Sequence, residues 1–370
     1  MISAATLPVP DALRASGRHI IALDGLRGVA AIAVMLQHSR LGERVALFGH
    51  GWLAVDFFLC LSRYVIGLAY DKRFAAGITF AAFAGLRVWR LYPMVLLGGL
   101  IGMVLFLATP QSHYCVAGHP DRLFTGAVSQ LLLFPMVAGP CLFVFNIVFW
   151  SLFLELAANA LHFAVFWKLG VRLLAGLAAV LGLVLAVAGM QAGWIQFGPW
   201  PGTVALGLVR CLFSYLLGYG LFRSRDRWTR QVPGLPFAAV AALLLAMLMI
   251  PPIGLHLPGS GALRPVLVIE ELALVGLVFP AIVALGTASH VRGRWPAALG
   301  ALSYPLYAIH LPLVYAVVSG FVAKGAVVFI VIRLVALAAI IALAWVVAVT
   351  IDLPINRLRH RAVKVVPALS

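Results

Sequence analysis

The chain has 370 residues, of which 64% are hydrophobic and only 10% are charged, and its mean hydropathy is +1.07. Soluble domains carry about 25% charged residues, so this composition excludes a soluble globular protein and indicates an integral membrane protein. The net charge of +16 comes from 27 Lys and Arg against 11 Asp and Glu. These basic residues lie in short loops between apolar runs and form no nucleic-acid-binding motif, so we expect them to control topology rather than to bind nucleic acid.

Ten apolar runs are long enough to cross a bilayer, at about 17–25 residues each. An eleventh, shorter run at 124–138 contains Pro135 and is typical of an interfacial or re-entrant helix. The first run follows a polar tail and has no clear small-residue cleavage site behind it, so we expect an uncleaved span rather than a signal peptide. The predicted spans are 20–39, 52–70, 91–109, 142–166, 171–190, 202–222, 235–252, 266–287, 299–319 and 326–350.

The basic residues between the spans predict the orientation. With the N-terminus in the cytoplasm, every inside segment holds at least two Lys or Arg, and only one outside segment does, as the positive-inside rule requires. We therefore expect an all-α protein with about ten transmembrane helices and cytoplasmic tails at 1–19 and 356–370. The single membrane domain between them, 20–355, shows no internal repeat, which argues against the many transporter folds built from repeats.

Four cysteines allow one disulfide prediction. Cys60 and Cys211 lie within spans, where we expect small buried apolar side chains. Cys115 and Cys141 bracket the long outside loop. They form a disulfide if that loop faces an oxidising space, and otherwise remain two free thiols.

The first span carries ionisable residues at both ends. In LDGLRGVAAIAVMLQHS, His38 follows Arg27 by eleven residues, and Asp24 precedes Arg27 by about one turn. Eleven residues make three helical turns plus about 20°, so these side chains share one face, with Arg27 and His38 about 16 Å apart along the axis. Ionisable groups in a membrane helix often mark a functional site. The alternative is a snorkelling arginine and a histidine satisfied near the outer surface.

The second span places an acid near the depth of His38. Asp56 lies about 6 Å from the outer end of this span. A carboxylate beside an imidazole fixes its tautomer and stabilises its cation, so we expect Asp56 to orient His38. Arg63 follows Asp56 by two turns. It either faces Arg27, which would favour an anionic acyl group, or pairs with Glu155 or another buried acid.

A pair of arginines precedes the third span. Arg87 and Arg90 are three residues apart in LRVWRLYP, so they project from one face of a helix at the cytoplasmic boundary. The planar guanidinium donates two hydrogen bonds at once to a phosphate, which makes this pair a candidate phosphate site. The alternative is ordinary anchoring of the span by positive charge.

The fourth span carries a polar stripe. Ser151, Glu155, Asn159 and His162 recur at helical spacing on an otherwise apolar segment, with Glu155 near mid-membrane. A buried acid at that depth is a functional candidate. The alternative is a seam of hydrogen bonds that packs helices together.

The last polar candidates lie on later spans. Ser303, Tyr307 and His310 share one face of the ninth span, which also contains two prolines. We expect the prolines to interrupt the helix, and discontinuities of this kind often line cavities. Arg210 in the sixth span and Arg333 in the tenth are further polar residues within spans. We expect these groups to face a water-accessible interior that several helices share.

Five segments together resemble the acyltransferase-3 family, in the order expected of it: LDGLRGVAAIAVMLQHS, GWLAVDFFLCLS, LRVWRLYP, VFWSLFLEL and LSYPLYAIHLP. The resemblance covers about residues 20–355. It implies a multi-pass enzyme of the bacterial inner membrane that O-acylates envelope glycans, exopolysaccharides or small molecules such as antibiotics. Two departures are Ala54 and Arg63, where the family usually has glycine.

The resemblance also implies roles for individual residues. Arg27 and His38 would be the essential pair of the first helix, and the two arginines of LRVWRLYP would bind acyl-CoA. Other positions of this chain match further site residues of the family, whose roles are less defined. The residues implied are His38, Asp56, Glu155, Tyr304 and His310 as catalytic groups, and Arg27, Arg87 and Arg90 as binding groups for the donor. Arg63 joins the expected donor-binding residues from its position alone, since it departs from the family pattern.

The function expected from these features is transfer of an acyl group from cytoplasmic acyl-CoA to a hydroxyl, with acetyl favoured and succinyl as an alternative. His38 would act as general base or carry the acyl group briefly. No metal is expected. We expect no extracytoplasmic esterase-like domain of the kind that some family members carry, so transfer would finish on the membrane domain or pass to a separate partner. A transporter or flippase that performs no chemistry is the rival class.

Overall fold

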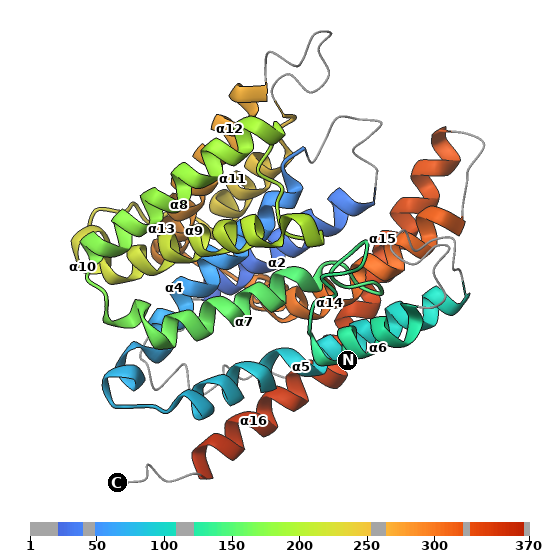
Figure 1. The fold of residues 1–370 in the computed structure, drawn as a ribbon, viewed down its shortest axis with the longest axis horizontal. Coiled ribbons are helices and arrows are strands. Elements are labelled where there is room, and N and C mark those ends of the chain that lie inside the picture. The colour runs from blue at the N-terminus through green and yellow to red at the C-terminus, as the bar shows by residue number, and fades with distance from the viewer. Residues whose placement is uncertain (1–20, 40–48, 109–121, 253–263, 321–325, 366–370) are drawn as a thin grey trace.

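The computed structural model describes residues 21–39, 49–108, 122–252, 264–320 and 326–365. These residues form helices joined by short irregular segments (Figure 1), which confirms the predicted all-α class. An isolated bridge between Pro236 and His290 is the only β pairing within those ranges. The predicted N-terminal tail lies outside the described residues. The C-terminal helix runs on to Val365, so the tail predicted from 356 begins inside a helix.

Most of the longer helices lie within a few residues of the predicted spans, but α5 begins at Phe80 instead of 91 and α7 at Phe149 instead of 142. Short 3-10 and π segments connect or extend some of them. In chain order the structure has α2 Ile21–His38, η1 Gly51–Leu53, α4 Ala54–Ala75, α5 Phe80–Ala108, α6 Leu123–Leu132, α7 Phe149–Ala164, η4 Phe166–Lys168, α8 Val171–Ala192, η5 Pro201–Thr203, α9 Val204–Arg223, α10 Arg225–Trp228, α11 Phe237–Met249, α12 Arg264–Ala273, η7 Leu274–Val278, α13 Phe279–Ala288, α14 Trp295–Gly320, α15 Ala326–Val347, η8 Ala348–Asp352 and α16 Leu353–Val365.

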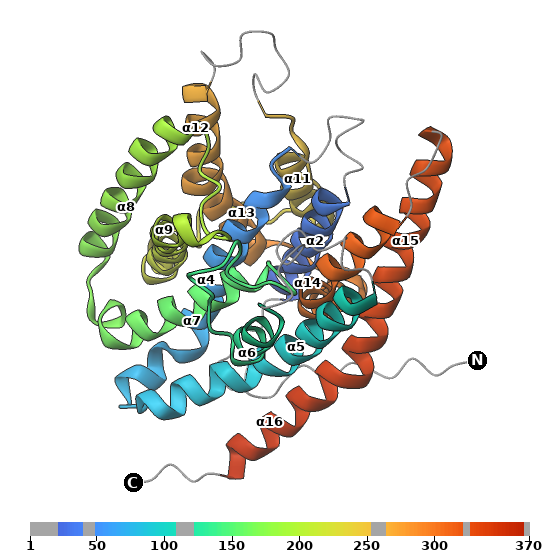
Figure 2. The same cartoon turned by 45° about the vertical axis from the view of Figure 1, so that its right-hand side comes forward.

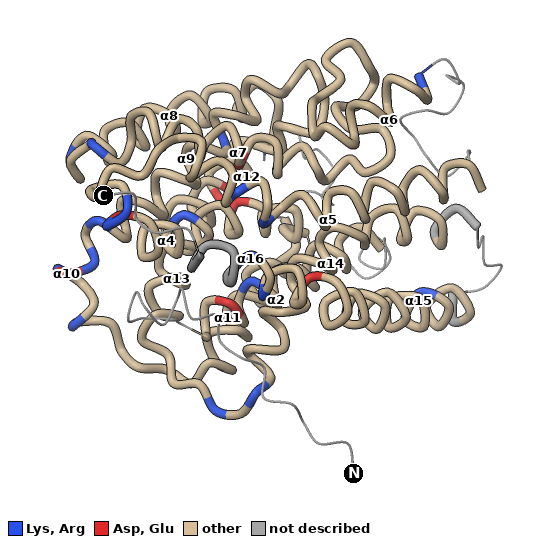
Figure 3. Tube along the Cα trace, turned by 90° about the horizontal axis from the view of Figure 1, so that it is seen from below, with Lys and Arg blue, Asp and Glu red and all other residues tan. Residues whose placement is uncertain are grey.

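Eight helical stretches in the described part of the chain are long and apolar enough to cross a bilayer, so the protein is a polytopic membrane protein. The difference from ten predicted spans arises at α7 and α11, which have only 16 and 13 residues. The eleventh predicted run is the still shorter α6, with 10 residues. Figure 3 shows many Lys and Arg residues at the end of the molecule where α10 lies, with acidic residues among the helices.

The contacts of α7 and α11 show that both run alongside longer helices. At one end of α11, Phe237 lies against Gly25 near the start of α2; at the other, the Leu248 carbonyl accepts the His50 N–H at 3.3 Å. Along α7, Phe149 lies against Gly98 and Phe163 against Phe80, so α7 is antiparallel to α5. Both helices therefore lie within the bundle beside spanning helices, although each is shorter than a bilayer-spanning helix.

Glycines allow α2 and α14 to pack closely side by side. A Cβ on Gly28 would lie 2.3 Å from the Leu299 carbonyl oxygen, and one on Gly300 would lie 2.7 Å from the Cβ of Asp24. Small residues permit this close approach of membrane helices. The two helices run parallel through the centre of the bundle (Figure 2), so that both ends of α2 meet α14. We name these ends the Arg27 end and the His38 end.

The two prolines of the ninth span do not interrupt its helix, and that prediction is wrong. Pro305 and Pro312 lie inside the continuous α14. A proline removes the hydrogen bond to the carbonyl four residues earlier, which for Pro312 is that of Ala308. The Asn146 side-chain amide donates to this Ala308 oxygen at 2.7 Å. A polar side chain from another segment thus satisfies the freed carbonyl.

Two non-helical segments enter the bundle from the His38 end. One begins at Leu133, whose left-handed φ of 51° ends α6, and continues to 148. The other, 193–200, links α8 to α9. Both contain fully buried residues, and the Leu142 N–H of the first donates to the Pro199 carbonyl of the second at 3.3 Å. Irregular backbone at membrane depth requires such partners within the protein.

The cysteines agree with the prediction where the structure describes them. Cys60 and Cys211 are free thiols buried in the core. Cys141 is buried and disulfide-bonded. Cys115, its predicted partner, lies outside the described residues.

Candidate active site

Two histidines meet at the His38 end of the α2–α14 pair. Nδ1 of His38 lies 3.2 Å from Nε2 of His310, and the ring centroids are 5.2 Å apart. His310 is fully buried and His38 is half-buried. Arg27 contacts Ser303 and His38 contacts His310, so the two contacts follow the same direction along two parallel helices.

The backbone of α14 fixes the tautomers of this histidine pair. Nδ1 of His310 lies 3.1 Å from the Leu306 carbonyl and 2.9 Å from that of Tyr307. Because carbonyl oxygens only accept, we assign a proton to this Nδ1, which makes Nε2 of the neutral ring an acceptor. His38 then donates from Nδ1–H to His310. The assignment leaves Nε2 of His38 with its lone pair, as a general base requires.

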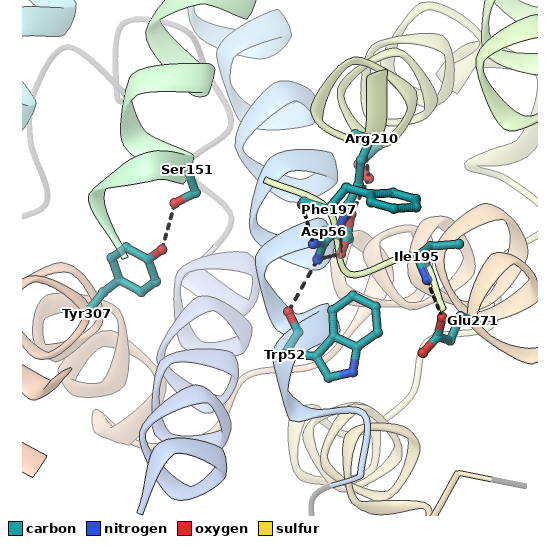
Figure 4. A network of polar contacts seen from close by, with 9 residues as sticks. Trp52, Asp56, Ser151, Ile195, Phe197, Arg210, Glu271 and Tyr307 are labelled. Carbon is teal, nitrogen blue, oxygen red and sulfur yellow. Dashed lines mark hydrogen bonds and ion pairs between the residues drawn. The ribbon is translucent and has the colours of Figure 1, made fainter. Parts of the chain in front are cut away.

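Asp56 lies in a different network, and the expectation that it orients His38 is wrong. Its carboxylate pairs with Arg210 at 2.5 Å (Figure 4). It also accepts a hydrogen bond from the Ser214 hydroxyl at 2.9 Å. Asp56 and Arg210 are both buried, so each ion needs the other. The helix beside Asp56 that supplies its partner is α9, whereas His38 finds its partner on α14.

The Asp56–Arg210 pair holds one of the non-helical segments inside the bundle. Arg210 donates to the Phe197 carbonyl at 3.0 Å, and the nearby Glu271 carboxylate accepts the Ile195 N–H at 2.8 Å (Figure 4). Ile195 and Phe197 are buried. These charged groups therefore satisfy backbone that could not meet water at this depth.

Tyr307 connects α14 to α7 next to the histidine pair. Its hydroxyl lies 2.6 Å from the Ser151 hydroxyl (Figure 4). The same hydroxyl lies 3.1 Å from the Val148 carbonyl, and the ring centroid of Tyr307 is 5.9 Å from that of His310. Since both hydroxyl partners are on or beside α7, Tyr307 fixes the position of α14 where His310 is anchored.

At the Arg27 end, Arg27 itself is held by two neighbours. Its Nη2 donates to Asp24 at 2.6 Å, and its Nε donates to the Ser303 hydroxyl at 3.1 Å. The side chains of Arg27 and Asp24 are each 21% exposed, so solvent or a ligand can reach them. The same face of α2 therefore carries a guanidinium at one end and the histidine pair at the other, as the sequence predicts.

Arg87 and Arg90 both lie within α5, which begins at Phe80 rather than at the predicted residue 91. Arg87 is buried and donates to Glu155 at 2.8 Å, and Ser62 donates to the same carboxylate oxygen at 3.0 Å. The structure thus brings together two predicted site residues, Arg87 and Glu155, as an ion pair.

Arg90 differs from Arg87 because its charge has no direct partner. Among the described residues its guanidinium makes no hydrogen bond or ion pair, and it is half-buried. It lies close enough to Arg27, Asp352 and Arg359 to interact electrostatically with each. Three helices therefore contribute guanidinium groups to one region.

The sequence did not point to Asp352 and Arg359 as members of this region. Both follow the last predicted span, where their charges are typical of a loop. In the structure α15, η8 and α16 form one continuous helix, and α16 lies beside α5 (Figure 1; Figure 2). Tyr304, a predicted site residue, lies in the same region and donates to the Leu91 carbonyl at 2.5 Å.

Arg63 belongs to neither of the two environments predicted for it. Its guanidinium donates to the Tyr215 hydroxyl and to Nε2 of His162, each at 2.9 Å. It does not pair with Glu155, whose partners are Arg87 and Ser62. Both predictions for this residue are therefore wrong.

The predicted polar stripe on α7 is present, and each member has its own partner from another helix. Glu155 faces the arginine region, and the other three members bond to α14, α9 and α4. The pairs are Ser151 with Tyr307, Glu155 with Arg87, Asn159 with Tyr215 and His162 with Arg63.

No group of three or more His, Cys, Asp or Glu side chains within the described ranges could hold a metal ion. The polar groups described above are imidazoles, guanidinium groups, hydroxyls and carboxylates that lie apart from one another. Together they offer a proton acceptor at the His38 end and anion-binding donors at the Arg27 end.

Comparisons with known proteins agree with this arrangement. Residues 20–349 match a family model described as an acyltransferase domain. The chain is 34% identical over 158 residues to protein 2 in the picA locus of Rhizobium radiobacter, a match that covers 38% of this chain and 80% of that protein. No solved structure matches the chain.

Proposed function

The chain belongs to the acyltransferase-3 family, and on that premise we propose that it moves an acyl group from acyl-CoA to a hydroxyl of an exported acceptor, with His38 as general base. The observation that carries this proposal is the hydrogen-bond chain from the Leu306 and Tyr307 carbonyls through His310 to His38. That chain supports a neutral His38 whose Nε2 is free to take a proton.

The proposed reaction begins with the acceptor hydroxyl at Nε2 of His38. Its oxygen attacks the thioester carbon while His38 takes the hydroxyl proton. Collapse of the tetrahedral intermediate breaks the carbon–sulfur bond, and the CoA thiolate takes the proton from His38. The products are an ester and free CoA. General-base assistance of this kind contributes about 10²–10⁴-fold to a rate.

The Arg27 end is the proposed donor site, facing the cytoplasm. Arg90 supplies a guanidinium with unused donors, and Arg27, Arg87 and Arg359 add positive charge around it. Phosphate groups favour such a cluster because each arginine fork can donate two hydrogen bonds. Glu155 holds Arg87 in place and is a positioning residue in this proposal.

We favour an acetyl group as the acyl group. A succinyl group would be favoured if Arg63 faced Arg27, but Arg63 is buried against His162 and Tyr215. A glycan or small molecule on the far side of a bacterial inner membrane is the proposed acceptor, reached directly or through a separate partner.

The test incubates the purified full-length protein with acetyl-CoA labelled in the acetyl group and a pool of envelope glycans. We expect a new labelled ester and release of free CoA. His38→Ala should lose at least about 10²-fold in rate, and His290→Ala, which alters an exposed histidine, should retain it. Full activity in a folded His38→Ala variant would refute the base role, and label moved across vesicles without an ester would favour a transporter.

A further inference from the structure

Arg333 is a charged residue within a spanning helix, and the proposed reaction does not use it. It lies on α15, about 10 Å along the axis from Ala326, the first residue of that helix. A charged side chain within a membrane helix is costly and often marks a functional position. The place to which its guanidinium reaches therefore shows what it does.

The position of Arg333 on α15 directs its side chain into the protein. Residues four, seven, eleven and fourteen places further along the helix are all buried, and they share one helix face with Arg333: Leu337, Ile340, Ala344 and Val347. Since α15 packs against α14, this buried face is the one in contact with the bundle. A snorkelling arginine carries its head to the membrane surface, whereas Arg333 is only 6% exposed.

The guanidinium of Arg333 reaches the end of α2. Its Nη1 donates to the Ser39 carbonyl at 2.7 Å, and Ser39 is buried. Ser39 directly follows His38, the last residue of α2, and its own N–H still donates to the Met35 carbonyl at 3.1 Å. Carbonyls at the end of a helix have no partner within it, and a cation there meets the negative end of the helix dipole. Arg333 thus caps α2 beside the proposed base.

A ring on the same helix holds the Arg333 side chain in place. Its Cζ lies 4.1 Å from the ring centroid of Phe329, one turn earlier on α15. A guanidinium stacks favourably on the face of an aromatic ring. Phe329 therefore restricts the directions in which Arg333 can donate, and the donor that reaches Ser39 is fixed from its own helix.

We infer that Arg333 is a positioning residue for His38, an inference that rests on the proposed function because it concerns the orientation of the base. His38 donates from Nδ1–H to His310 on α14, and the backbone one residue later accepts from Arg333 on α15. One contact holds the ring and the other holds the main chain, so together they direct Nε2 to one place. A reacting group displaced by about 1 Å can lose about 10²-fold in rate.

The first experiment compares full-length variants in the acetyl-CoA assay. Arg333→Met keeps a long side chain but removes its donors, so kcat should fall about 10- to 100-fold while KM for acetyl-CoA stays within about twofold. Arg333→Lys keeps one cationic donor and should recover part of kcat. Tyr215→Phe is the matched control, since it removes a buried hydrogen bond from Arg63 away from the histidine pair, and it should retain kcat. An unchanged kcat in Arg333→Met, or an equal fall in Tyr215→Phe, overturns the inference.

Nitrogen NMR of isotope-labelled histidine tests the positioning without acyl transfer. The His38 signal, identified by its loss in His38→Gln, should show a protonated Nδ1 and an unprotonated Nε2. Arg333→Met should convert it to a mixture of tautomers. Phe329→Ala, which removes only the ring contact, should do so to a smaller extent and decides the matter if Arg333→Met does not fold.

The NMR result separates this inference from the proposed function. A His38 tautomer that is unchanged in both variants overturns the positioning role. A wild-type protein that forms no ester, but whose His38 tautomer depends on Arg333, refutes the proposed function and supports the contact between Arg333 and the end of α2 as the one that orients His38.

Discussion

Two arginines, Arg210 and Arg90, show how differently this protein uses the same side chain. Arg210 is buried, and its donors meet Asp56 and the Phe197 carbonyl. Arg90 is half-buried and has no hydrogen bond within the described residues. A saturated guanidinium holds a fold together, whereas one with unused donors beside other cations is available to an anionic ligand. The contrast separates structural charges from those proposed to act on substrate.

The largest effect is expected where the network around Arg210 is broken. Asp56→Ala leaves a buried guanidinium without its counter-ion, which costs about 3–5 kcal/mol. The free energy of unfolding in detergent should fall by that amount. Asp226→Asn, at a carboxylate that is 87% exposed, should leave stability unchanged. A stable Asp56→Ala protein with reduced turnover would reverse the contrast and give Asp56 a role in the reaction.

His310 should affect turnover more than stability. His310→Ala removes the acceptor that keeps the proton on Nδ1 of His38, so we expect kcat to fall about 10²-fold while KM for acetyl-CoA changes little. His310→Gln retains an acceptor oxygen and should recover part of the rate. Equal loss in the Ala and Gln variants, with an unchanged pH profile, would indicate that His310 only fills space.

Substitution of Arg90 should have the smallest effect, and it should change KM for the donor rather than stability or kcat. Arg90→Gln removes donors proposed to bind phosphate, so KM for acetyl-CoA should rise about tenfold with little change in the unfolding midpoint. Arg359→Gln should raise KM by about two- to fivefold. Assays with 3′-dephospho-acetyl-CoA identify which phosphate each arginine contacts. An unstable Arg90→Gln protein would place Arg90 in the same class as Arg210.

Much of the fold could be predicted because the length of an apolar run determines whether a helix can cross the membrane. The start of α5 was missed for the same reason, since Arg87 and Arg90 end the apolar run although the helix begins at Phe80. The continuity of α14 was missed because Asn146, 162 residues earlier in the chain, satisfies the carbonyl freed by Pro312.

The helix faces that carry the candidate site residues could be predicted from the sequence, but the partners of those residues could not. Helical spacing correctly placed the α7 stripe and the Arg27–His38 face. It could not show that α9 lies beside Asp56 while α14 lies beside His38. The depth of a residue along its span can be predicted from the sequence. The order of the helices around the bundle cannot, because it depends on packing between residues far apart in the chain.

The close contact of α2 with α14 fixes the position of one helix along the other. Gly28 lies against the Leu299 carbonyl, so the helices cannot slide past each other without a steric clash. Arg27 and His38 both lie on α2, so the rise of that helix sets their separation at about 16 Å, and the contact with α14 keeps His310 beside His38. If the arginines bind the donor as proposed, we expect a donor whose arm is too short to reach His38 to bind without reacting. Truncated thioesters of graded length would measure the shortest donor arm that still reacts.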